Sequence, residues 1–313
     1  MALAFTFPGQ GSQAVGMGGA LSEQFSVARA VFDEVDAALD QPLFKLMQEG
    51  PIEELTLTEN AQPAIMAVSV AAMRVLKEEF GVDVTAAKFV AGHSLGEYSA
   101  LCAAGALSLT DAATLLKLRG RSMQAAVPSG QGAMAALLGA DMETAAKAVD
   151  AGSAHGVVTI ANDNAPGQIV ISGAKSAVEA TLEAAKAGGV KKAIMLSVSA
   201  PFHCPLMLPA ADVMKDALAK ADIKDPVVPV VTNVSATAVS DASTIRNQLV
   251  EQVTGKVRWR ESVDFMHAQG IDRFAEAGAK VLTPMIKRHI KEAEGIALVT
   301  ADDLEGFANS LKG

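Results

Sequence analysis

A serine stands at the centre of Gly92-His93-Ser94-Leu95-Gly96, between the apolar run Phe89–Ala91 and a segment with a helical pattern. The pattern G-x-S-x-G after a strand and before a helix is typical of a serine that attacks acyl groups. Small flanking residues let the chain turn sharply, and the start of a helix offers free N–H groups to a developing oxyanion. The alternative is a serine that only caps the helix. The strand–turn–helix context favours the nucleophile.

A serine nucleophile needs a base, and the chain has five histidines. His203 follows an expected strand and lies between Pro201 and Pro205, in a rigid loop that suits a catalytic side chain. The side chain of His93 must diverge from its neighbour Ser94. The other three lie in a turn or on polar helices: His155, His267 and His289. We predict His203 as the base, with a structural role as the alternative, and find no acid placed to complete a triad.

The elements that would position these residues alternate between short apolar strands and helices, which predicts an α/β fold with a mostly parallel sheet. The expected strands are residues 3–7, 89–91, 227–232 and a run around Phe274. The expected helices are residues 21–39, 62–80, 96–104, 109–119, 209–221, 243–252 and 281–289, with one more through Phe265. Ser108 and Asp111 resemble a capping box at the start of one of these helices.

The pattern between residues 131 and 199 is different. Strands are expected at 133–138, 157–161, 168–171 and 192–198, with helices at 142–149 and 176–187 and a turn at 162–167. The order βαββαβ is ferredoxin-like. We therefore expect residues 131–199 to be a small inserted domain, and residues 1–130 and 200–313 to form the large one.

Composition excludes several classes of function. The formal net charge of −9 argues against nucleic-acid binding, which depends on lysine and arginine, and against a basic membrane-surface protein. No apolar stretch is long enough to span a membrane, and no signal peptide is recognisable. With only Cys102 and Cys204 there is no disulfide framework. These observations predict a cytoplasmic protein.

Four motifs together resemble the malonyl-CoA:acyl-carrier-protein transacylases. They are Phe-Pro-Gly-Gln-Gly-Ser-Gln (7–13), Gly-His-Ser-Leu-Gly-Glu-Tyr (92–98), Arg119-Gly120 and Pro-Phe-His-Cys (201–204). Their order and spacing match that family over nearly the whole chain. The resemblance implies an α/β-hydrolase-like large domain and transfer of malonyl from coenzyme A to the phosphopantetheine thiol of an acyl carrier protein. Malonyl-CoA is then a substrate, and no metal or bound cofactor is implied.

The resemblance also implies roles for the motif residues. Ser94 is similar to the acylated nucleophile of the family and His203 to its base. The main-chain carbonyl of Gln252 is similar to the group that orients this histidine, which accounts for the missing acid. The backbone N–H groups of Gln10 and Leu95 correspond to the oxyanion hole.

Four side chains resemble substrate-binding residues of the family. Arg119 is similar to the arginine that binds the free carboxylate of malonate, and a planar guanidinium suits that task. Taken alone, Arg119 would be interpreted as a charge on a helix surface. Phe202 resembles a bulky residue that crowds an α-methyl group, and Met123 is a candidate lining residue. Asn164 resembles a residue near the substrate entrance, with an ordinary Asx turn as the alternative.

Other functions remain open from the residues themselves. A serine esterase or thioesterase would need no carboxylate-binding arginine, and a non-catalytic carrier-binding scaffold would need no intact site. The run Gly9–Ala14 fits the dinucleotide pattern G-x-G-x-x-A. Two basic groups are candidates for carrier docking, although solvated charges explain them equally well: Lys191-Lys192, and Lys256 with Arg258 and Arg260.

Overall fold

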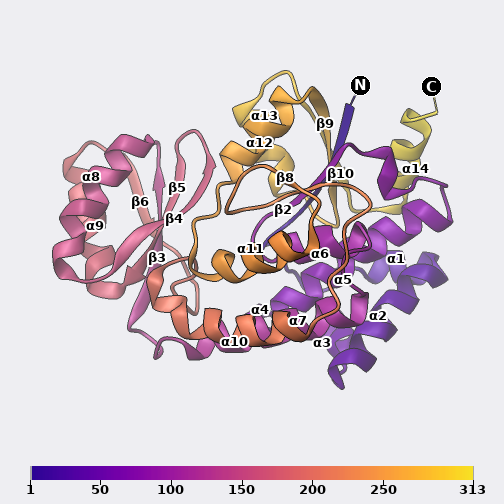
Figure 1. Ribbon diagram of the computed structural model, residues 1–313, viewed down its shortest axis with the longest axis horizontal. Coiled ribbons are helices and arrows are strands. Elements are labelled where there is room, and N and C mark those ends of the chain that lie inside the picture. The colour runs from indigo at the N-terminus through magenta and orange to yellow at the C-terminus, as the bar shows by residue number, and fades with distance from the viewer. Residues whose placement is uncertain (1, 313) are drawn as a thin grey trace.

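The computed structural model describes residues 2–312, which form two sheets with helices packed around them (Figure 1). The larger sheet has the strand order β10-β9-β1-β2-β7-β8, and all its neighbouring strands are parallel except β7 and β8. Its strands are β1 (Ala2–Phe7), β2 (Phe89–Gly92), β7 (Val230–Val231), β8 (Ala238–Val239), β9 (Ile271–Ala277) and β10 (Glu294–Leu298). The predicted α/β class with a mostly parallel sheet is confirmed.

Alternation along β1 gives the large sheet two buried faces. Leu3, Phe5 and Phe7 belong to the largest core, and the ring of Phe5 lies 5.9 Å from that of Phe307. Ala4 faces the opposite core, which contains Trp259. The first face is covered by α5 (Thr58–Glu78), α6 (Gly96–Ala103) and α14 (Ala301–Ser310), and the second by α12 (Trp259–Ala268) and α13 (Leu282–His289).

The helix expected over residues 21–39 is in fact two helices. The break lies at Phe25, whose backbone is extended (φ −129°, ψ 118°), and the Phe25 ring packs 6.0 Å from that of Phe80. The other helices outside residues 131–199 are α1 (Gly19–Gln24), α2 (Ser26–Leu39), α3 (Leu43–Glu49), α4 (Ile52–Thr56), α7 (Leu109–Ala125), α10 (Leu208–Lys220) and α11 (Ala242–Thr254). The short 3₁₀ turns of the described chain are η1 (Val84–Ala86), η2 (Ser153–His155) and η3 (Pro205–Met207).

Helix α7 begins where the sequence predicts and lies unusually close to α5. The Ser108 hydroxyl accepts a hydrogen bond from the N–H of Asp111 at 3.0 Å, which confirms Ser108 as the N-cap. The Asp111 carboxylate accepts from the Ser108 hydroxyl at 2.7 Å rather than from the Ser108 backbone, so the reciprocal half of the predicted capping box is not formed in the described part of the chain. A Cβ atom on Gly120 would lie 2.5 Å from the Cα atom of Glu59 in α5. Glycine therefore permits a close helix contact at the residue that follows Arg119.

The smaller sheet has the order β4-β5-β3-β6, with every neighbouring pair antiparallel. Its strands and helices follow the predicted order βαββαβ: β3 (Gly132–Leu138), α8 (Met142–Gly152), β4 (Val158–Ala165), β5 (Gln168–Ala174), α9 (Lys175–Ala187) and β6 (Lys192–Met195). Helices α8 and α9 cover one face, on the left in Figure 1. Met134 and Val170 lie on the other face, toward the large sheet.

The turn predicted at residues 162–167 is wrong for its first four residues, because β4 continues to Ala165. The extension is held by the segment before α12. The N–H of Asp163 donates to the carbonyl of Val257 at 3.0 Å, and the N–H of Val257 donates to that of Ala161 at 2.8 Å. Polar residues that are typical of a turn thus stay extended, because a distant segment supplies their backbone hydrogen bonds.

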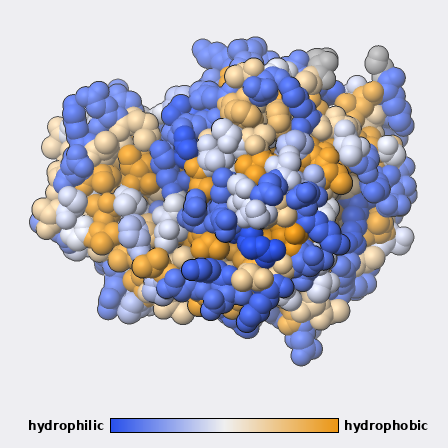
Figure 2. Space-filling model, in the orientation of Figure 1, coloured by the Kyte–Doolittle hydropathy of each residue, from blue (hydrophilic) through white to orange (hydrophobic). Residues whose placement is uncertain are grey.

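Figure 2 shows apolar residues in separate areas among polar ones on the face in view, as is normal for a folded chain. Among residues 2–312, no helix combines the length and the apolar character that crossing a membrane requires.

Candidate active site

Three parallel strands end at the same edge of the large sheet, beside a cavity that Gln10 and Ser94 line. Gln10 follows β1, Ser94 follows β2 and Asn233 follows β7. Because parallel strands end at the same edge of a sheet, these residues meet there, where ligands of open α/β sheets bind. The cavity has a volume of about 240 Å³, and the free face of the small sheet contributes Met134 and Val170 to its wall. This space suits a short acyl group.

The turn between β2 and α6 needs glycine on both sides of Ser94. The backbone of Ser94 has φ 54°, a conformation that non-glycine residues rarely adopt. A Cβ atom on Gly92 would lie 1.9 Å from the backbone of Gly96, and one on Gly96 would lie 2.2 Å from the carbonyl oxygen of Phe7. The predicted sharp turn is confirmed, and it places the serine hydroxyl at the cavity.

Asn233 holds this strained turn through its side chain. Its Oδ1 accepts a hydrogen bond from the N–H of Ser94 at 2.7 Å, and its Nδ2 donates to the carbonyl of Gly92 at 2.6 Å. Asn233 is not among the residues predicted from the sequence. The available signal was its position directly after an expected strand, at the edge where Ser94 was also expected.

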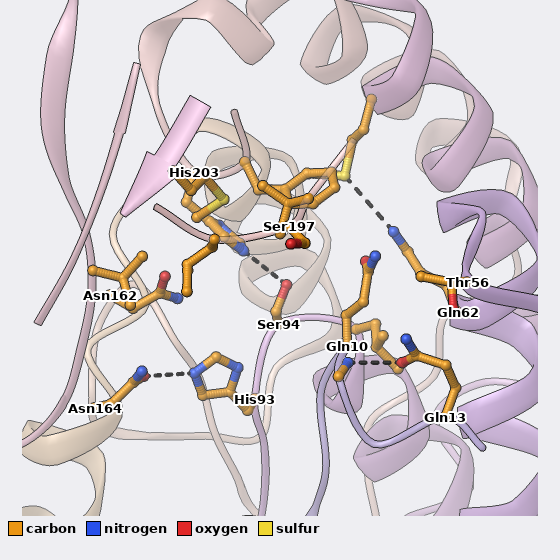
Figure 3. A pocket seen from close by; sticks show the side chains of 18 of the residues that line it. Gln10, Gln13, Thr56, Gln62, His93, Ser94, Asn162, Asn164, Ser197 and His203 are labelled. Carbon is orange, nitrogen blue, oxygen red and sulfur yellow. Dashed lines mark hydrogen bonds between the residues drawn. The ribbon is translucent and has the colours of Figure 1, made fainter. Parts of the chain in front are cut away.

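Ser94 and His203, 109 residues apart, are in hydrogen-bond contact (Figure 3). The Ser94 hydroxyl lies 2.7 Å from Nε2 of His203, and Nδ1 of His203 lies 2.9 Å from the carbonyl of Gln252 and 3.1 Å from that of Gly255. Carbonyls only accept, so Nδ1 carries the ring proton and Nε2 is free to accept the serine proton. The geometry thus gives a serine beside a neutral base that two carbonyls orient.

The protonation state of His203 agrees with this geometry. Burial, followed by the positive charge of Arg119, lowers the pKa of His203 from 6.5 to about 3. The imidazole is therefore neutral near pH 7 before substrate binds. A proton that it gained during a reaction would be held weakly and passed on readily.

The backbone N–H groups of Gln10 and Leu95 are free for a ligand. Within residues 2–312, neither donates a hydrogen bond to another protein atom. Leu95 immediately precedes α6, and the Gln10 loop lies against the Ser94 turn, since a Cβ atom on Gly9 would lie 2.8 Å from the carbonyl oxygen of His93. Both donors border the cavity, where a developing oxyanion would need them.

Arg119 is not the surface charge that its sequence context alone suggests. It is 1% exposed, and its Nη1 donates to Gln62 at 2.8 Å. Its Nη2 donates to the side-chain oxygen of Gln252 at 2.8 Å and to the Ser94 hydroxyl at 3.1 Å. The close packing of α7 on α5 brings a buried guanidinium to the serine, where it can bind an anionic acyl group.

The remaining predicted site residues also border the cavity, apart from Gln252, which lies behind it. Phe202 and Met123 are buried apolar walls, and the Met123 sulfur accepts a hydrogen bond from Gln62. Asn164 lies in β4 rather than in an Asx turn, and its Oδ1 is 2.8 Å from Nε2 of His93 (Figure 3). His93 thus diverges from the serine as expected and fixes the small sheet to the turn.

Two alternatives from the sequence lose support. The glycine-rich loop after β1 does not enter a helix at once, because α1 begins only at Gly19, so the dinucleotide pattern lacks its helix N-terminus. The three basic residues proposed as one docking group each have acidic partners. Lys256 and Arg258 pair with Glu261, and Arg260 pairs with Asp163.

Comparison with known proteins identifies the family. A family model described as an acyl transferase domain matches residues 4–301. The chain belongs to the acyl transferase family. The malonyl CoA-acyl carrier protein transacylase of Bacillus subtilis (strain 168) is 47% identical to it over 312 residues, covering 99% of this chain and 97% of the relative.

Solved acyl transferases have the same fold. The acyl-carrier-protein S-malonyltransferase of Bartonella henselae is 51% identical, with a TM-score of 0.98 and full coverage of both chains. A malonyl-transacylase in complex with a type II PKS acyl-carrier protein is 41% identical, with a TM-score of 0.95, and the match covers 99% of this chain and 100% of that one.

Proposed function

We propose that this acyl transferase is an acyl-carrier-protein S-malonyltransferase of fatty-acid biosynthesis. It takes malonyl from coenzyme A and transfers it to the phosphopantetheine thiol of an acyl carrier protein through a malonyl ester on Ser94. One observation carries the proposal: the Ser94 hydroxyl lies between Nε2 of His203 at 2.7 Å and Nη2 of Arg119 at 3.1 Å. A nucleophile, its base and a carboxylate-binding group thus converge in a cavity of acyl size.

In the first half-reaction, the Ser94 oxygen attacks the thioester carbonyl while His203 takes the hydroxyl proton. The carbonyl oxygen becomes an oxyanion, which the N–H groups of Gln10 and Leu95 stabilise. The tetrahedral intermediate then collapses as the carbon–sulfur bond breaks, and His203 protonates the departing coenzyme A sulfur. The main-chain carbonyl of Gln252 keeps the imidazole in the required tautomer throughout.

The second half-reaction repeats these steps in reverse. The carrier thiol gives its proton to His203 and attacks the malonyl ester, and the Ser94 oxygen leaves with that proton. No metal or bound cofactor takes part, and malonyl-CoA is a substrate. Water must be excluded between the two halves, since it would hydrolyse the ester. Phe202, Met123 and the two sheets around the cavity support this exclusion.

The acyl group is recognised by the walls of the cavity. Arg119 would bind the free carboxylate of malonate through two parallel hydrogen bonds, replacing its contact with the serine hydroxyl. Phe202 and Met123 limit the space near the α-carbon. Asn164 lies at the small-sheet side of the cavity, where the pantetheine arm would enter.

We also propose a division into two domains. Residues 1–130 and 200–313 form an α/β-hydrolase-like catalytic domain, and residues 131–199 form a ferredoxin-like domain. The strand order β4-β5-β3-β6 with two helices on one face supports the second assignment. Cys102 and Cys204 are free thiols, which suits a reducing, cytoplasmic location. Lys191 and Lys192 are exposed and remain a candidate docking site for the carrier.

The test is to isolate the malonyl enzyme. After incubation with malonyl-CoA and an acid quench, peptide mass mapping should find malonyl on the Ser94 peptide, and the Ser94→Ala variant should carry none. Addition of a carrier with its phosphopantetheine arm should then move the label to the carrier. An unmodified wild-type protein, or release of free malonate in place of malonyl carrier, contradicts the proposal.

A further inference from the structure

A fully buried carboxylate lies directly behind the candidate nucleophile, and the scheme above leaves it unused. Glu97 is the second residue of α6 and is 0% exposed. Its Oε2 accepts hydrogen bonds from the backbone N–H of Asn233 and from Nε2 of Gln252, both at 2.9 Å. Within residues 2–312 its Oε1 has no partner. Burying a carboxylate is unfavourable, so its presence here calls for a function.

The contact with Glu97 determines how the Gln252 amide is oriented. The oxygen that faces Gln252 accepts hydrogen bonds, so Gln252 must turn its NH₂ group toward it. The amide oxygen of Gln252 then points the other way, where it accepts the hydrogen bond from Nη2 of Arg119 at 2.8 Å. Arg119 has only donors, so this is the one amide orientation that satisfies both neighbours.

The same amide connects the candidate nucleophile, base and carboxylate-binding group. Its Nε2 also donates to the carbonyl of Ser94 at 3.1 Å, while the main-chain carbonyl of the same residue orients His203. Glu97 therefore lies at the start of a chain of hydrogen bonds that ends at Arg119. Its charge is also opposite to that of the buried guanidinium, although burial raises the pKa of Glu97 to about 7.

We propose that Glu97 is a positioning residue that acts through the Gln252 side chain to hold Arg119 ready for the free carboxylate of the acyl group. The inference rests on the proposed function, in which Arg119 binds malonate. If Glu97 only stabilised the fold, replacing it would lower the rate of Ser94 acylation by the same factor with every acyl donor. A positioning residue for Arg119 affects donors that carry a carboxylate most strongly, because the acetyl group has no carboxylate for the guanidinium to bind.

The experiment compares Ser94 acylation by malonyl-CoA and acetyl-CoA in the wild type and the Glu97→Gln variant. The glutamine side chain at position 97 keeps the shape of glutamate but carries no charge. It also allows the side-chain amide of Gln252 to flip, so that its oxygen and nitrogen exchange places. We expect kcat/KM for malonyl-CoA to fall roughly tenfold, mainly through KM because the carboxylate contact is present in the bound substrate. The acetyl-CoA value should change less than about twofold.

Ser99→Ala is the matched control. Ser99 lies in the same helix, is equally buried, and its hydroxyl has no partner within the described residues. Both substrates should react with this variant as with the wild type. The inference is overturned if Glu97→Gln leaves both rates unchanged, or lowers both in the same proportion. Arg119→Ala, measured in parallel, separates the role of Glu97 from that of Arg119. If this variant leaves the ratio of kcat/KM for malonyl-CoA to that for acetyl-CoA unchanged, the proposed role of Arg119 itself is contradicted.

A double-variant cycle gives a second measure if Glu97→Gln is unstable. Gln252→Met removes the side-chain amide and keeps the main-chain carbonyl that faces His203. If Glu97 acts through Gln252, adding Glu97→Gln to Gln252→Met should lower the malonyl-to-acetyl ratio by less than about twofold further. Fully additive effects overturn the proposed route.

Discussion

At the scale of single residues, the role proposed for Arg119 predicts that the acyl donor must carry a free carboxylate. Replacing Arg119 by alanine removes a charge-assisted hydrogen-bond pair that only a dicarboxylic acyl donor can form. We expect the ratio of kcat/KM for malonyl-CoA to that for acetyl-CoA to fall by roughly ten- to hundredfold. Rates of Ser94 acylation by the two donors measure this directly. An unchanged ratio would favour an esterase-like site without carboxylate recognition.

The buried histidine makes the protein sensitive to acid. The pKa of His203 is about 3 in the folded chain against 6.5 ordinarily. As the pH falls, the histidine therefore takes up a proton in the unfolded chain before it does so in the folded chain. His203 leaves the unfolding free energy unchanged above pH 6.5, and its protonation in the unfolded chain lowers that free energy as the pH falls from 6.5 toward 3. When the pH is lowered from 7 to 4, the unfolding free energy of the His203→Gln variant should fall by about 3 kcal/mol less than that of the wild type.

Urea unfolding at the two pH values checks this difference. The carboxyl groups are common to both proteins, and their contributions cancel in the comparison. A variant of the exposed His155 to glutamine serves as control and should follow the wild type. Equal acid-induced losses in all three proteins would show that His203 is not held neutral by the fold.

At the scale of elements, the strand–turn–helix unit around Ser94 tolerates no side chain at its glycines. In Gly96→Ala the new methyl would lie 2.2 Å from the carbonyl oxygen of Phe7 and 2.7 Å from that of Pro8. Both are backbone atoms beside the Gln10 loop, so the strand and the loop must move apart. We expect a loss of more than about 3 kcal/mol of unfolding free energy and of Ser94 acylation.

Gly306→Ala is the matched control for this prediction. Gly306 lies inside α14, and a Cβ atom there would meet nothing within 4 Å. Alanine should stabilise this helix by about 0.5–1 kcal/mol and leave acylation unchanged. Denaturant midpoints of the two variants give the comparison, and a Gly96→Ala protein as stable as the wild type would be inconsistent with the described turn.

At the scale of the whole molecule, an ion pair joins the small sheet to helix α12, which packs on the large sheet. The Asp163 side chain in β4 is only 2% exposed, and Nε and Nη2 of Arg260 in α12 donate to its carboxylate at 3.1 and 2.8 Å. Arg260→Ala leaves a buried charge without its partner. We expect a loss of about 2–4 kcal/mol of unfolding free energy, measured by urea unfolding.

Two further variants test the cause of that loss. Asp163→Ala combined with Arg260→Ala should recover part of the stability, because no buried charge is left without a partner; Asp264, the other partner of Arg260, is half exposed. Arg29→Ala breaks an ion pair with Asp33 whose side chains are more than half exposed, and should change stability by less than about 0.5 kcal/mol. Similar losses in Arg29→Ala and Arg260→Ala would contradict a specific role for the buried pair.

The sequence by itself determined the features that local chemistry encodes. The turn at Ser94 was recognisable because its close backbone contacts require glycine at positions 92 and 96. The order of strands and helices followed from their different periodicities. Residue types and context alone predicted Ser94 and His203, and the resemblance of four short motifs then added the role of Arg119.

Only the tertiary structure decided what depends on contacts between distant segments. A polar helix pattern cannot reveal that Arg119 is buried, because α5 buries it where Gly120 permits close packing. Asn233, Glu97 and the Gln252 side chain matter through hydrogen bonds to residues more than 130 positions away in the sequence. Such partners satisfy buried polar groups that only the assembled fold creates, so no local pattern records them.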